Sequence, residues 1–282
     1  MKYRVLPLGG CPLNVPLSIL RSRGLLTSVF QDVGFLRWPT AISSTDSLQL
    51  LRFAKSEIDI PEELQPFTYF DPENRPKPGR GHFLDAAEIV LVELCTPLVF
   101  NFNGYALNPN HVNNFLIESS KDDDDGIKRM LMQWRYEGVQ MQNEAKRADF
   151  SAKLLEYYEP KLPAQSLLIR FLKEMYGSYL KAEDMARDLR SIRESFDRPI
   201  ALILHHYNYM PGARPVSYPP TFLADLKTLI KMLDLPVFDP APVVKAHGTD
   251  VALAKDMRHY ALDFFAIIAD EYLGFMRGLL GR

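Results

Sequence analysis

The segment AAEIVLVELCTP, residues 86–97, is the clearest buried strand in this sequence. Its apolar run is continuous rather than alternating, which is typical of a parallel strand covered on both faces. Helical patterns separate it from other short apolar runs, so the sequence predicts an α/β fold, a three-layer α/β/α sandwich around a parallel sheet. The other predicted strands are 3–8, 25–33, 199–209 and 236–240.

The length of 282 residues is compatible with a single α/β domain, residues 1–282, that carries an insertion. Residues 109–193 have a mostly helical pattern and are too long for a plain crossover between strands, so we expect a helical insertion there. The proline-rich polar stretch 56–82 predicts a long surface loop.

The net charge of −2 favours neither a nucleic acid nor an anionic membrane as partner. No uncharged apolar run approaches the roughly 20 residues that a membrane span needs, and the N-terminus has no signal-peptide pattern. We therefore expect a cytoplasmic protein. The two cysteines, Cys11 and Cys95, lack the spacing of a zinc site, and we expect no metal.

Cys11 follows the first predicted strand in the turn Gly9-Gly10-Cys11-Pro12. Here Cys11 is predicted to be the N-cap of a helix and Pro12 its first residue. Ligands of open parallel sheets bind where strands end and helices begin, and a helix N-terminus favours a thiolate. Cys11 is therefore a candidate nucleophile; the alternative is a small buried hydrophobic residue.

A second candidate pair, Asp256 and His259, precedes the amphipathic helix predicted within residues 256–280. A carboxylate at this spacing can accept a hydrogen bond from one imidazole nitrogen and leave the other facing a nucleophile. A surface aspartate beside a helix-capping histidine would have the same pattern.

Together the two segments resemble the SGNH (GDSL-type) hydrolase superfamily, nearest to its branches with a Gly-x-Cys turn, some of which modify surface polysaccharides. The resemblance implies a flavodoxin-like strand order and an acyl ester hydrolase or O-acyltransferase. Cys11 would be the nucleophile, His259 the base and Asp256 the acid that orients it. It implies a small-molecule or glycan substrate and no metal or redox cofactor, with a coenzyme A thioester as a candidate acyl donor.

The oxyanion site of that superfamily has several candidate counterparts here. Where its Gly-x-Asn-Asp block follows the third strand, this chain has ELCTPLVFNFNG, in which Asn103 or Thr96 could supply a donor. Gly10 borders the same site, and Ser43 or Gly34 matches the family's glycine after the second strand. The missing block supports the alternative of a non-catalytic binding or assembly protein on this scaffold.

Three residues near the end of the fourth predicted strand are candidates for substrate binding: His206, Asn208 and Arg214. Neighbouring residues of a strand point to opposite faces, so His205 and His206 cannot both face a pocket or bind one metal. Cys95 is expected to be simply buried. In the flavodoxin-like order that the resemblance implies, the strand that Cys95 ends neighbours the strand before Cys11, so a disulfide between the two cysteines is the alternative.

Overall fold

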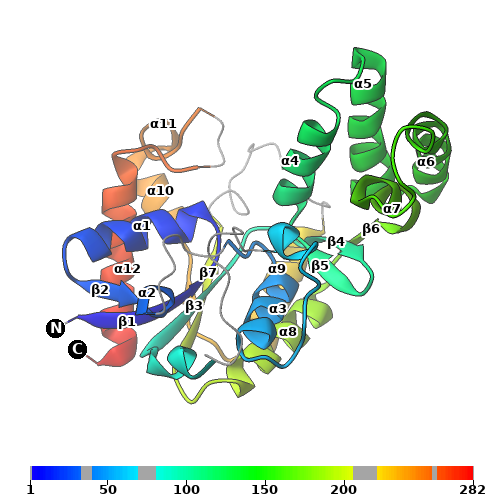
Figure 1. The fold of residues 1–282 in the computed structure, drawn as a ribbon. Helices are drawn as coiled ribbons and strands as arrows, with labels where there is room; N and C mark the ends of the chain where they lie inside the picture. The colour runs from blue at the N-terminus through cyan, green and yellow to red at the C-terminus, as the bar shows by residue number, and fades with distance from the viewer. Residues whose placement is uncertain (1, 33–39, 69–80, 206–220, 256–258, 282) are drawn as a thin grey trace. The chain divides into compact units, whose positions relative to one another are not determined.

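The computed structural model describes residues 2–32, 40–68, 81–205, 221–255 and 259–281 (Figure 1). The chain divides into two compact units. The first consists of Met1–Asp59, Tyr69–Pro97 and Lys181–Arg282, and the second of Ile60–Thr68 and Leu98–Leu180.

The first unit contains a five-stranded parallel sheet of order β2-β1-β3-β7-β8. If only the five strands of this sheet are numbered in chain order, their order in space is 2-1-3-4-5, the flavodoxin-like arrangement. The fold confirms the predicted α/β class and three-layer architecture. The strands are β1 (Tyr3–Leu8), β2 (Leu26–Ser28), β3 (Ile89–Leu94), β7 (Ile200–Leu204) and β8 (Val237–Phe238).

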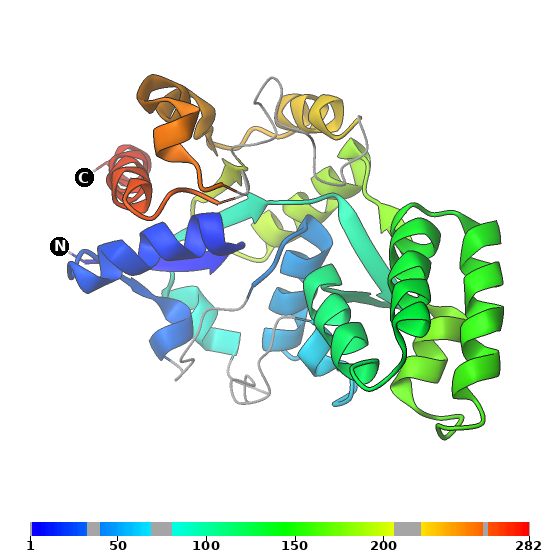
Figure 2. The ribbon, with the colours of Figure 1, turned by 90° about the horizontal axis from the view of Figure 1, so that it is seen from above.

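Helices cover both faces of this sheet, because successive strand residues point to opposite sides and both sets are apolar. On one face, Ile89 and Leu91 of β3 pack in a core cluster with residues of α1 and α12, and blue α1 lies beside red α12 in both views (Figures 1 and 2). Val90 and Val92, also fully buried, point to the other face, where α3 packs against α8 and α8 against α9.

The helices of the first unit follow the strands in the order that parallel connections require. They are α1 (Cys11–Ser22), α2 (Val29–Asp32), α3 (Ser44–Ala54), the 3₁₀ helix η3 (Gly81–Ala86), α8 (Ala182–Glu194), α9 (Phe222–Met232), α10 (Ala241–His247), α11 (Thr249–Ala252) and α12 (Phe264–Leu280). The N-cap of α1 is Gly10 rather than the predicted Cys11, which is the first helical residue.

The prediction of one strand over 25–33 is wrong beyond Ser28. The Ser28 hydroxyl accepts a hydrogen bond from the backbone N–H of Phe30 (3.3 Å), a local contact that favours a helical turn over a continued strand. Val29 and Phe30 are buried in that turn, so the apolar run reflects burial and not strand periodicity.

The second unit has its own antiparallel sheet of order β5-β4-β6 and a set of helices. Its elements are η1 (Gln65–Phe67), β4 (Leu98–Phe102), β5 (Tyr105–Leu107), α4 (Pro109–Ser119), α5 (Asp125–Gln133), the π-helix η4 (Trp134–Gln140), α6 (Glu144–Tyr158), α7 (Leu167–Glu174) and β6 (Tyr176–Tyr179). The predicted insertion, 109–193, overlaps this unit, but the unit also contains the β4–β5 hairpin, and α8 belongs to the first unit.

The π-helix packs closely on its neighbours. The Trp134 indole N–H donates to Ser151 Oγ (2.9 Å), whose hydroxyl donates to the carbonyl oxygen of Leu172 (2.7 Å). A Cβ atom at Gly177 of β6 would lie 2.2 Å from the carbonyl oxygen of Val139. Glycine at 177 therefore allows the strand and the π-helix to meet backbone to backbone.

None of the helices in the described ranges is long and apolar enough to cross a membrane.

We expect Gly177→Ala to lower the free energy of unfolding by about 2–4 kcal/mol, because the added methyl group overlaps the Val139 carbonyl. Gly274→Ala, on α12 with no atom within 4 Å of the added Cβ, should instead raise stability by up to about 1 kcal/mol. Urea denaturation followed by circular dichroism measures both. Equal midpoints for Gly177→Ala and the unchanged protein would contradict this packing.

Candidate active site

The corner between β1 and α1 lies directly against the end of β3. The backbone N–H of Gly10 donates to Glu93 Oε2 (2.9 Å). A Cβ atom at Gly9 would lie 2.7 Å from Glu93 Cβ, and one at Gly10 would lie 3.2 Å from Cys95 Sγ. The two glycines are needed because a buried carboxyl and a thiol occupy the space beneath the turn.

Cys11 begins α1 at this corner, and its side chain is exposed. The thiol does not have the lowered pKa expected of a helix N-terminus. The protein around the sulfur and the nearby Glu93 carboxylate raise its pKa, and the residue's own backbone N–H opposes this only in part. Cys11 is therefore an accessible thiol that needs a base to ionise it.

Glu93 is the charged residue of β3 and has no exposed surface. Burial raises its pKa to about 7, against hydrogen bonds from Gly10, Cys95 and Leu13 that favour the carboxylate. Within the described ranges, Glu93 Oε1 has no hydrogen-bond partner. Sequence reasoning missed Glu93, although a single acidic residue inside the apolar run IVLVEL was the available signal.

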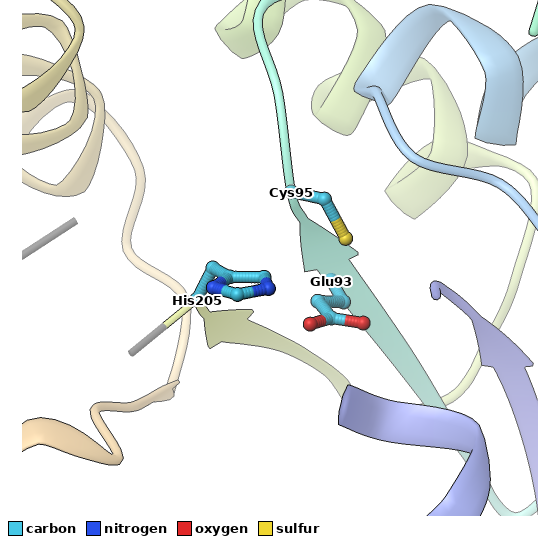
Figure 3. A group of neighbouring side chains, drawn as sticks. All are labelled: Glu93, Cys95 and His205. Atoms are coloured by element: carbon cyan, nitrogen blue, oxygen red, sulfur yellow. The ribbon is translucent and has the colours of Figure 1, made fainter. Parts of the chain in front are cut away.

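Cys95 and His205 converge on Glu93 from two neighbouring strands (Figure 3). Each of the three residues offers a ligand atom, and these atoms all lie within 4.8 Å of one another. Burial, and next the Glu93 charge, raise the pKa of Cys95 well above its ordinary value. The predicted burial of Cys95 is confirmed, and both cysteines are thiols rather than a disulfide.

His206 is the histidine that the sequence predicted for a binding site, but His205 is the one that lies beside Glu93 and Cys95. His205 is buried, like Glu93 and Cys95, because it shares its sheet face with Ala201 and Ile203 of the α1–α12 core. Four other candidates lie outside the described residues: His206, Asn208, Arg214 and Asp256. Gly34 lies outside them too.

Ser43 and Thr96 lie at the same end of the sheet as Cys11. The carbonyl oxygen of Ile42 accepts from the backbone N–H groups of both Cys95 and Thr96 (3.0 Å each), so the loop before α3 joins the end of β3. The Ser43 hydroxyl accepts from the N–H of Asp46 (3.1 Å) as the N-cap of α3. Ser43 thus stabilises the helix start.

Two oxyanion candidates have other roles in the structure. The Gly10 N–H already donates to Glu93, so it is not available to an oxyanion. Asn103 lies in the second unit, with Gly104 in the turn between β4 and β5. Both turn residues have positive φ (50° and 80°), the conformation that makes Asn-Gly a preferred hairpin turn.

His259 is exposed, and an isolated antiparallel bridge fixes the backbone beside it. Its carbonyl oxygen accepts from the N–H of Ala254 (2.9 Å), and the next residue, Tyr260, bridges Leu253. Tyr260 is buried in the core cluster with Leu13 of α1. Burial and the charges of Glu93, Asp239 and Cys95 raise its pKa well above the ordinary value, so Tyr260 lies within electrostatic reach of Glu93.

The C-terminal helix is also anchored beside Cys11. The Tyr272 hydroxyl donates to the carbonyl oxygen of Pro12 (3.3 Å). The Gly-Gly-Cys corner and the segment that carries His259 therefore both border the α1–α12 core.

Comparison with known protein families matches residues 3–275 to the model of the TviD N-terminal domain. The chain belongs to this family. No curated protein and no solved structure matches it. The family match covers both the sheet with its Gly-Gly-Cys corner and the second compact unit.

Two further buried acidic residues, Asp46 and Asp188, stabilise the loop before α3, whose Ile42 carbonyl contacts the end of β3. Asp46 Oδ2 accepts from the N–H of Ile42 (3.3 Å), and Asp188 Oδ2 accepts from the hydroxyls of Ser44 (2.8 Å) and Thr45 (2.7 Å). Burial is the main cause that raises the pKa of Asp46, to about 7, and that of Asp188. Asp46 therefore holds its proton to a higher pH in the folded protein than in the unfolded chain.

We expect Gly9→Ala to destabilise the protein by about 2–3 kcal/mol and Gly10→Ala by about 1 kcal/mol. The reason is that the Cβ of the first would overlap Glu93 Cβ and Leu13 Cδ2, both at 2.7 Å, whereas the second only crowds the Cys95 sulfur. Urea denaturation shows which of the two variants loses more free energy of unfolding. The reverse order would contradict the close approach to β3.

The raised pKa of Asp46 predicts a pH dependence of stability. The contribution of Asp46 to the free energy of unfolding is fully present below about pH 4 and is lost as the pH rises through about 7, because the unfolded chain releases the proton more readily. Asp46→Asn should reduce the fall in unfolding free energy between pH 5 and 7.5 by on the order of 2 kcal/mol. Urea titrations at both pH values measure it, and an unchanged fall would contradict the assignment.

Proposed function

We propose that this domain catalyses acyl transfer, as an acyl ester hydrolase or O-acyltransferase in which Cys11 is the nucleophile. The observation that supports this most directly is the exposed Cys11 thiol at the first turn of α1, where β1 ends. Helix N-termini at this edge of an open parallel sheet are where ligands of such folds bind.

In the proposed reaction, Cys11 Sγ attacks the carbonyl carbon of an ester or thioester. His259 accepts the thiol proton and returns it to the leaving alcohol or thiol, while Asp256 holds the imidazole. The raised pKa of Cys11 makes such a base necessary. Water or a sugar hydroxyl then attacks the thioester acyl-enzyme and regenerates the thiol.

The oxyanion formed in each step requires fixed donors. The backbone N–H of Cys11 is one candidate, since it already favours negative charge on the Cys11 sulfur. Thr96, at the end of β3, is a second. With a coenzyme A thioester as donor and a glycan or small molecule as acceptor, we place the reaction in the cytoplasm, where such donors are made.

The alternative is a binding or assembly domain that retains the scaffold without turnover. Two observations favour it: the Gly10 N–H is engaged by Glu93, and the pKa of Cys11 is raised rather than lowered. A domain of this kind would bind ligand at the same corner but form no covalent intermediate.

A generic acetyl ester tests the proposal. Cys11→Ala should reduce turnover to background, and His259→Ala should reduce it about 10²–10⁴-fold, because each removes a group that acts on the reacting atoms. His247→Ala is the matched control: His247 is an exposed histidine of α10 whose ring contacts the Val243 carbonyl and the Phe264 ring, and its loss should leave turnover unchanged.

Mass spectrometry of the quenched reaction provides the second measurement. An acetyl group on the peptide that contains Cys11 supports the proposed intermediate, and buried Cys95 in the same sample is the internal control. Full activity of Cys11→Ala would refute the nucleophile. Ligand binding without any acetylation of Cys11 would favour the binding domain.

A further inference from the structure

The cluster of Glu93, Cys95 and His205 combines three different metal-binding groups in one buried place (Figure 3). The carboxylate and the thiol come from the end of β3, and the imidazole follows the last residue of β7. These strands are hydrogen-bonded neighbours in the middle of the sheet, so a rigid backbone sets the spacing of the three groups.

The distances fit a tetrahedral ion after small side-chain movements. The three ligand atoms lie within 4.8 Å of one another. A tetrahedral zinc site with its usual bond lengths separates its ligand atoms by about 3.3–3.8 Å. All three groups already point into the same space (Figure 3), so we expect metal binding to require movement of side chains and not of the strands.

The buried carboxyl group of Glu93 gives an independent reason to expect a bound cation. Glu93 is fully buried, its Oε1 has no hydrogen-bond partner in the described ranges, and no lysine or arginine of those ranges is among the groups that influence its pKa. Buried carboxylates without a cation are costly and are usually paired or coordinate a metal. A divalent cation would displace the protons of Glu93 and Cys95 into solvent and balance the two negative charges that remain on the carboxylate and the thiolate.

We infer that Glu93, Cys95 and His205 form a binding site for a divalent transition-metal ion, with zinc as the ion that best suits the donor set. Carboxylate oxygen, thiolate sulfur and imidazole nitrogen are the three ligand types that zinc accepts. Three protein ligands leave a fourth position for water or a ligand, the arrangement of catalytic rather than structural zinc sites. The inference does not depend on the proposed acyl transfer.

The experiment uses the full, untagged chain. After removal of metal with a chelator, the protein is titrated with Zn²⁺ alone and with Co²⁺ alone, and bound metal is counted by mass spectrometry. We expect one ion per chain, and with Co²⁺ a thiolate-to-cobalt charge-transfer band. Failure of the unchanged protein to bind either ion at one equivalent would overturn the site, whatever any variant does.

Variants assign the ligands. Cys95→Ser should abolish the charge-transfer band, and Glu93→Gln and His205→Gln should each weaken binding at least 10-fold, with folding checked by circular dichroism. Cys11→Ser and His247→Ala should retain both the band and the stoichiometry. A band lost in Cys11→Ser but kept in Cys95→Ser would overturn the assignment. Since Cys11→Ser removes the proposed nucleophile but not the metal, the two proposals can fail separately.

Discussion

The buried carboxyl group of Glu93 is the constraint on which the geometry of the site depends. It lies at the end of a central strand and binds the N–H of Gly10, so the turn between β1 and α1 is held against β3. The absence of side chains at Gly9 and Gly10 follows from this contact, because the Glu93 and Cys95 side chains occupy the space beneath the turn. The position of Cys11 at the start of α1 follows in turn.

The same carboxyl group determines the chemistry of its neighbours. The protein around the Cys11 sulfur, and next the charge of Glu93, raise the pKa of Cys11 against the effect of the helix N-terminus, so the thiol is accessible but not activated by its helix alone. The Gly10 N–H is engaged and cannot stabilise an oxyanion. These features set this corner apart from a simple helix-capped nucleophile: any activity needs a base and further oxyanion donors, or a cation that compensates Glu93.

The two compact units follow different folding rules within one chain. The first buries continuous apolar strands between helices, whereas the second relies on an antiparallel sheet, an Asn-Gly hairpin turn and a π-helix that meets β6 at Gly177. The second unit's strand β6 pairs with β4, which directly follows β3 in the sequence. Helical periodicity in 109–193 therefore described the helices but concealed β6, whose partner strands β4 and β5 precede that range.

The sequence by itself determined the fold class and the place of Cys11 at the start of a helix, because apolar runs, glycines and prolines act locally. The flavodoxin-like strand order was implied by the family resemblance alone, and the sheet has that order. The sequence did not identify the β5-β4-β6 sheet. It also did not identify the helical turn after Ser28, because buried apolar residues in a short helical turn form the same continuous apolar run as a buried strand. Only the tertiary structure decided that Glu93, Cys95 and His205 meet and that the pKa of Cys11 is raised. Such effects arise between strands that lie far apart in the chain, where residue spacing carries no information.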